Sequence, residues 1–180
     1  NCHKLNMNYL LKRTMIFNIF IFLTVLFSFN VYAACDDQPT NEVDWTNCNF
    51  IEQLDLSGVS LANAQMTGIN LALANLEKSQ INNANMSYGN FIEQIDLSGV
   101  ALAGAQMTGV NLALVNLEKS QINNANMSYG NFILGNFNNS NLFSSNMQYA
   151  NCNNTVFDNA NLAKVNFEGA NLFMASFRGA

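Results

Sequence analysis

Large apolar side chains recur at every fifth position over most of this chain, from Leu56 to its last residues. The residue two places before each of them is small or β-branched, as at Ala84 and Ile69, and the residue directly before it is usually Asn. Apolar residues of a helix recur with a period of about 3.6, and those of a strand with a period of about 2. A five-residue period therefore fits neither element as the repeating unit.

The first part of this region is a duplication. Residues 50–90 and 91–131 are copies of one another that differ at only a few sites. Each copy consists of eight units of five plus one additional residue, which lies within 50–56 and again within 91–97. After Phe132 the five-residue spacing continues without interruption.

A square coil with four sides of five residues each, and thus four units per lap, explains the pattern. The large residues then sort by side when the additional residue of each copy is allowed for. Side one contains Leu56, Leu76, Leu97, Leu117, Phe137, Phe157 and Phe177, and side two contains Leu61, Ile81, Leu102, Ile122, Leu142 and Leu162. Side three contains Met66, Met86, Met107, Met127, Met147 and Phe167, and side four contains Leu71, Phe91, Leu112, Phe132, Cys152 and Leu172. Like residues collect on one side, as a lap of four units predicts.

The individual units also carry a recognisable motif. Ala160-Asn161-Leu162 and Ala170-Asn171-Leu172 match A(D/N)LXX, and Ala84-Asn85-Met86 is a variant with Met at its centre. In this, residues 50–180 resemble the pentapeptide-repeat family. The resemblance implies an all-β fold, a right-handed quadrilateral β-helix, in which the central residue and the small residue two places earlier point inward. At a lap spacing of about 4.8 Å, about six coils make a rod on the order of 30 Å long, preceded by a helical signal segment.

Residues 1–33 have the features of an export signal. Met7 is the expected start, Lys12 and Arg13 precede the apolar stretch 15–29, and Ala33 ends a cleavage site. Two alternatives remain open at this stage. Residues 15–34 are long enough to stay as a membrane anchor, and the segment that ends at Cys35 resembles a bacterial lipobox, which implies lipidation of that cysteine. Each alternative gives an exported protein that is periplasmic, secreted or anchored in the membrane.

Residues 34–49 are polar, contain the single proline and the single tryptophan, and are expected to cap the first lap of a solenoid that occupies 50–180. Cys35 and Cys48 flank this segment and are candidates for a disulfide in an oxidising compartment. Cys152 takes an inward position, where a free thiol packs as a small hydrophobe. The chain ends in mid-repeat at Ala180, so either it continues beyond this residue or its uncapped last coil pairs with a second copy.

Composition argues against an enzyme. The sequence has a net charge of −5. Without the leader the net charge becomes −8, because 12 acidic and 4 basic residues then remain. The histidine of the chain, His3, lies in the leader, so the mature chain lacks the base of Ser-His-Asp sites and the commonest metal ligand. No phosphate-binding loop of the G-x-x-x-x-G-K type occurs. We therefore expect no catalytic residue, no cofactor, no metal and no nucleic-acid partner.

Two ordered sets of side chains are candidates for an interaction surface. The acidic set lies on side one, where lysines are interspersed, and consists of Asp55, Glu77, Asp96, Glu118 and Asp158. The aromatic set lies two residues after the centres of side three and consists of Tyr88, Tyr129 and Tyr149. A solvated stripe that keeps the rod soluble explains the acids as well as a binding site does. Aromatic residues are enriched at protein interfaces.

The sequence thus predicts an exported, non-enzymatic scaffold with a structural role or an unknown protein partner. Some pentapeptide-repeat proteins mimic DNA and bind type II topoisomerases, which confers quinolone resistance, so a protein of that kind is the first alternative. The export signal argues against it. So does the charge density, since duplex DNA carries a charge about every 1.7 Å of its axis. A repeat arm of a longer cell-surface protein is the second alternative.

Overall fold

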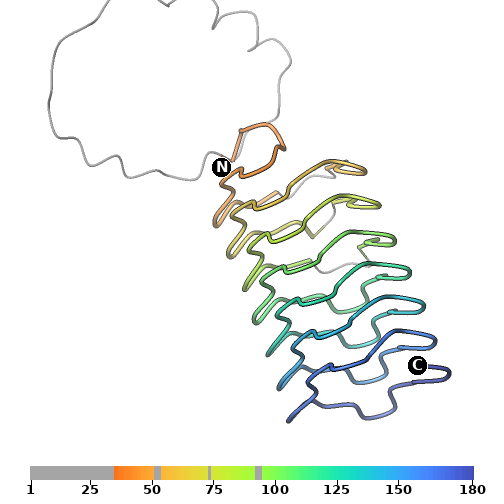
Figure 1. Ribbon diagram of the computed structural model, residues 1–180. Helices are drawn as coiled ribbons and strands as arrows, with labels where there is room; N and C mark the ends of the chain where they lie inside the picture. The colour runs from red at the N-terminus through yellow and green to blue at the C-terminus, as the bar shows by residue number, and fades with distance from the viewer. Residues whose placement is uncertain (1–34, 51–53, 73, 92–94) are drawn as a thin grey trace, which may run out of the picture.

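The computed structural model describes residues 35–50, 54–72, 74–91 and 95–180. Figure 1 shows them as a stack of laps that runs from the N-terminal, orange end to the C-terminal, blue end. In the described ranges the structure has no helix and no continuous strand, because each pairing of neighbouring laps is an isolated parallel bridge. The predicted signal segment lies outside these ranges. Within them, no helix is long and apolar enough to cross a bilayer.

The bridges fix the length of a lap. On side three they join Gln65 to Asn85, Asn85 to Gln106 and Gln106 to Asn126, so the methionines that follow these residues lie one above another. After residue 95 the partners are four units apart, or twenty positions, as in the bridge between Asp96 and Asn116. Partners that span residues 92–94 are one position further apart, because the lap takes up the additional residue there. The predicted all-β solenoid is confirmed.

Each five-residue unit ends in a tight turn. The N–H of Ala150 donates to the carbonyl oxygen of Met147 at 3.1 Å, and the same bond recurs from unit to unit. Within the described ranges, the second residue after each centre has a positive φ, for example 57° at Tyr149 and 60° at Asn124. Asn and Gly adopt this left-handed conformation at low energetic cost, whereas it is less favourable for other L-residues. We call this residue the turn position.

The abundant Asn side chains directly before the centres bond in two directions. Asn136 accepts a hydrogen bond at its Oδ1 from the backbone N–H of Asn138 at 3.0 Å. Its Nδ2 donates to Oδ1 of Asn116, one lap earlier, at 3.1 Å. The first bond stabilises the turn within a unit, and the second stacks one lap on the next. Asn is therefore favoured here because one short side chain serves both contacts.

The interior is a single apolar column in which all four sides take part. Towards the C-terminal end the rings of side one stack, with centroids 5.0 Å apart for Phe137 and Phe157. Most of the buried hydroxyl groups donate to backbone carbonyls, as where Thr155 donates to the oxygen of Phe132 at 2.7 Å. A hydroxyl without such a partner would cost about 1–3 kcal/mol on burial.

Backbone pairing begins before the predicted boundary at residue 50. Asp44 forms a bridge with Gln65, and Asn49 forms one with Asn70. Trp45, directly after the first of these residues, is buried above Met66. The predicted cap segment therefore supplies part of the first lap itself, since Trp45 and Phe50 already keep the five-residue spacing.

The buried thiol of Cys152 allows a test of the side-four column. Burial raises its pKa from 9.0 to about 12, so the reactive thiolate should be about a thousandfold scarcer than in the unfolded chain. We expect iodoacetamide at pH 8 to label Cys152 slowly in the native protein and rapidly in urea, as followed by mass spectrometry. Equal labelling rates in the two states would contradict the inward placement of this residue.

Candidate interaction surface

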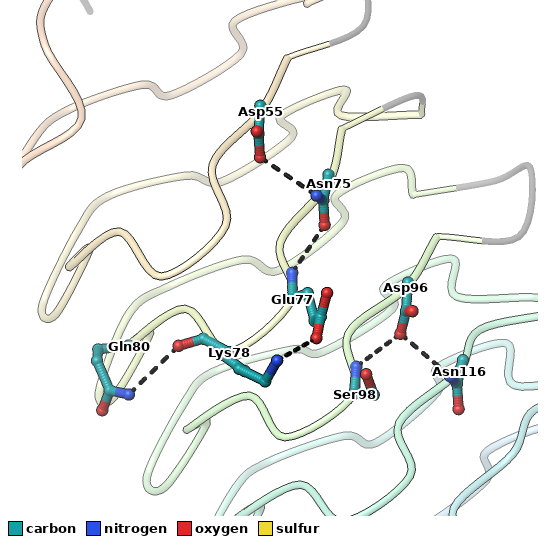
Figure 2. A network of polar contacts seen from close by, with 8 residues as sticks. All are labelled: Asp55, Asn75, Glu77, Lys78, Gln80, Asp96, Ser98 and Asn116. Carbon is teal, nitrogen blue, oxygen red and sulfur yellow. Dashed lines mark hydrogen bonds and ion pairs between the residues drawn. The ribbon is translucent and has the colours of Figure 1, made fainter.

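The acidic residues of side one are anchored by polar contacts with their neighbours. The carboxylate of Asp55 accepts hydrogen bonds from the backbone N–H of Ser57 at 3.0 Å and from Asn75 Nδ2 at 3.2 Å. The same arrangement returns in the second copy, where Asp96 accepts from Ser98 and Asn116 (Figure 2). Both aspartates thus replace Asn in the ladder between laps.

The glutamates of this side are paired with the lysines that follow them. Lys119 Nζ lies 2.8 Å from a carboxylate oxygen of Glu118. Lys78 forms the same pair with Glu77 (Figure 2), and the hydrogen bond to that carboxylate raises the pKa of Lys78. These pairs are exposed and stabilise the fold little. They do, however, neutralise two of the five acidic residues of this set.

The hydrogen bonds of Asp158 predict that the stability of the protein depends on pH in the acidic range. Its pKa is lowered, first by a hydrogen bond from the Ser176 side chain and next by one from the backbone N–H of Arg178. A lowered pKa means that Asp158 contributes stability above its unfolded value of 3.8 and that this contribution disappears as the pH falls through the folded value. We expect Asp158→Asn to lose less stability than wild type between about pH 5 and pH 2 in urea titrations. Parallel curves for the two proteins would contradict these contacts.

The three tyrosines occupy turn positions and project into solvent. Tyr88, Tyr129 and Tyr149 are 68%, 63% and 51% exposed, respectively. The rings of Tyr129 and Tyr149 stack with centroids 5.1 Å apart. All three have a positive φ of 57–59°, a conformation that disfavours a bulky residue. Burial in the core does not explain why large aromatic residues occupy these exposed turn positions.

The structure does not bring the acidic and aromatic sets together. The centres that carry them, such as Leu117 and Met127, are two units apart, which is half a lap. They are two separate surfaces. In the part of the chain that the structure describes, no group of three or more His, Cys, Asp or Glu residues could hold a metal ion. Cys35 and Cys48, the predicted pair, are joined by a disulfide with their Cα atoms 5.5 Å apart.

Sequence analysis missed a second row of exposed apolar residues, at the turn positions of side four. Leu114, Leu134 and Met174 are 41%, 54% and 70% exposed. They are whole laps apart, as the tyrosines are, and this spacing could have indicated the row.

Comparison with known proteins agrees with this geometry. The family model described as pentapeptide repeats matches in eight copies over residues 55–91, 94–132 and 136–172. The chain belongs to the pentapeptide repeat family. A comparison with curated protein sequences found no match.

Solved structures of other pentapeptide repeat proteins have a similar fold. HetL from the cyanobacterium Nostoc sp. strain PCC 7120, which is involved in heterocyst differentiation regulation, is 22% identical, with a TM-score of 0.51 over 76% of this chain and 70% of HetL. Rfr23 from the cyanobacterium Cyanothece 51142 is 22% identical over 74% of this chain and 90% of its own, with a TM-score of 0.32. QnrB1, a plasmid-mediated fluoroquinolone resistance protein, is 19% identical over 72% of this chain and 77% of its own, also with a TM-score of 0.32. At 22% identity and a TM-score of 0.51, the similarity to HetL supports the fold and no finer property.

Proposed function

We propose that this pentapeptide repeat protein is an exported, non-enzymatic scaffold that binds another protein through its exposed tyrosines. The observation that carries the proposal is the alignment of Tyr88, Tyr129 and Tyr149 at one turn position of a stiff stack, each more than half exposed. Export is supported by the leader, with Lys12 and Arg13 before the apolar stretch and a cleavage site at Ala33.

Rigid presentation makes these tyrosines suitable for recognition. Tyr supplies a large contact area with few rotatable bonds, and it is enriched among the residues that dominate binding energy. The backbone below each ring is held by hydrogen bonds to the next lap, such as the bond from Tyr129 N–H to the oxygen of Gln148 at 2.9 Å. The backbone around these tyrosines is therefore already ordered before a partner binds, which lowers the entropic cost of binding.

The acidic row supports a DNA-mimicking role less well. Glu77 and Glu118 are paired with the lysines that follow them, and Asp55 and Asp96 are hydrogen-bonded within the ladder. Successive laps are about 4.8 Å apart, so even one acid per lap would be sparser than the phosphates of a duplex. We assign the acidic residues of side one a role in keeping the protein soluble.

A photo-crosslinking experiment tests the proposal. A photoreactive phenylalanine analogue at Tyr129 of the full chain should give a discrete protein adduct in the exported fraction, and N-terminal sequencing should show cleavage after Ala33. The same analogue at Asn124 is the matched control, because this residue is exposed at a turn position of the same lap on side two. Equal adducts at both positions would refute binding through the tyrosines. Recovery in the cytoplasm bound to a type II topoisomerase would favour the DNA-mimicking alternative.

A further inference from the structure

A disulfide lies at the N-terminal end of the stack of laps. Figure 1 shows the first described residues, in orange, as a loop at this end. Cys35 begins the loop and is joined to Cys48, which lies 13 positions later. The end of a solenoid exposes an apolar layer and unpaired backbone groups, which a terminal cap has to cover. The loop and its disulfide are placed to act as this cap.

Cys48 belongs to the first lap itself. It takes the small inward position two residues before Phe50, and its carbonyl oxygen accepts a hydrogen bond from the N–H of Asn70 in the next lap at 2.9 Å. Cys48 is 1% exposed, and Cys35 packs against the same apolar core. The disulfide therefore connects the beginning of the loop to the interior of the rod and not to its surface.

The two ends of the loop are attached by different means. At its C-terminal end, the N–H of Glu42 donates to the carbonyl oxygen of Ala62 at 2.9 Å, and Asn41 Oδ1 accepts from the N–H of Ala62 at 3.2 Å. Between described residues, by contrast, no backbone hydrogen bond joins residues 35–39 to a lap, and residues 36–38 are exposed. Within the described part of the chain, the bond between Cys35 and Cys48 is thus what attaches the beginning of the loop.

We propose that this disulfide is a redox switch, which closes the cap when Cys35 and Cys48 are oxidised and opens it when they are reduced. On closure the two thiols lose two electrons and two protons, which the disulfide of a thiol–disulfide oxidoreductase takes up to become a dithiol. A reducing dithiol reverses this exchange. Thiols stay reduced inside the cell, so the cap closes after export to an oxidising compartment. The inference rests on the proposed function for this compartment alone and does not depend on the tyrosines.

The single tryptophan of the chain reports on the cap. Trp45 is the first inward centre of the described stack and is 1% exposed. Dithiothreitol added to the purified, oxidised protein should shift its fluorescence emission to longer wavelengths, because the opened cap admits water to the indole ring. Cys35→Ser should show the shifted spectrum without reductant and should not respond to it. A Cys35→Ser spectrum identical to that of the oxidised wild type would contradict the proposal.

Cys152→Ala is the matched control. This substitution removes the buried free thiol of side four and leaves the bond between Cys35 and Cys48 in place. We expect the emission of this variant to shift on reduction as that of the wild type does. A response to reductant that disappears in Cys152→Ala and persists in Cys35→Ser would overturn the proposal.

Thiol labelling locates the opening along the chain. In the reduced but folded protein, we expect iodoacetamide to label Cys48 at least about tenfold faster than Cys152, because the opening is confined to the first lap. In the closed rod both residues are almost completely buried, so equally slow labelling of the two would show that the cap stays closed without its disulfide. Equally fast labelling would show that reduction unfolds the whole rod. Either result would overturn the proposal.

The exported protein itself should carry the disulfide. Alkylation in urea should modify Cys152 alone before reduction, and Cys35 and Cys48 as well after reduction. A lipid on Cys35 would refute the switch, because a sulfur in a thioether cannot join Cys48. Exported protein without the disulfide would likewise refute the switch and leave export standing. Protein found in the cytoplasm whose oxidised form still opens on reduction would refute export and leave the switch standing.

Discussion

Replacing Phe137 by Ala should lower the free energy of unfolding by about 3–5 kcal/mol. Phe137 is fully buried on side one, and its ring stacks on Phe157 at 5.0 Å and meets Phe132 edge-on at 5.7 Å. The laps above and below are held in register by backbone bridges, so they cannot collapse into the space that the ring leaves. Urea unfolding followed by far-ultraviolet circular dichroism gives the loss directly.

Phe173→Ala is the control for this prediction. Phe173 is a phenylalanine of the last lap that is 65% exposed, so its removal should change the free energy of unfolding by less than about 0.5 kcal/mol. A similar loss in both variants would show that the stability of the rod does not depend on inward rings. It would thereby contradict the assignment of inward and outward positions.

Gly130→Ala should be the second most damaging of the single substitutions considered, with a loss of about 1–3 kcal/mol. A Cβ on Gly130 would lie 2.7 Å from Cζ of Phe132 and 3.0 Å from the carbonyl oxygen of Met127. Both neighbours are fixed, the ring by the surrounding core and the carbonyl by the turn. Gly130 does not have a positive φ, so the loss measures crowding and not backbone strain.

A second substitution should relieve this crowding. The sequence Ala-Asn-Leu occurs in the chain at residues 160–162 and 170–172, so Ala is compatible with Leu at the next centre. We expect Gly130→Ala combined with Phe132→Leu to be more stable than the sum of the two single losses predicts, by about 1 kcal/mol or more. Strictly additive losses in the double-mutant cycle would show that the Phe132 ring is not what excludes a side chain at residue 130.

The lap length could be predicted from the sequence because burial fixes the register. A large polar side chain at an inward centre would be buried without water and would pack poorly, which destabilises the fold. The five-residue period of apolar centres is therefore kept along the whole rod. The additional residue in each copy was also visible, because it shifts every later centre by one. Backbone pairing already starts at Asp44, within the segment predicted as a cap, because Trp45 and Phe50 keep the five-residue spacing.

The surfaces could be predicted only in part. The turn position that the tyrosines share follows from the period, and so does the assignment of the acids to side one. The ion pairs between Lys119 and Glu118 and between Lys78 and Glu77 could not be deduced, because they depend on the left-handed turn that brings adjacent side chains together. The exposed Leu114 and Leu134 were overlooked because a large apolar residue in a turn contradicts the simple rule of apolar inside and polar outside.

Long-range contacts in a nuclear Overhauser spectrum of the labelled protein test the central claim, the lap of four five-residue units, most directly. The account predicts contacts between the laps of Met127 and Met147, where the amide of Met127 donates to the oxygen of Asn146 at 2.7 Å. It also predicts that the separation between contacting residues increases by one position wherever the contact spans residues 92–94, as for Gln80 and Ala101. Amide contacts confined to residues three or four apart, or between antiparallel neighbours, would contradict the solenoid and the alignment of Tyr88, Tyr129 and Tyr149 that depends on it.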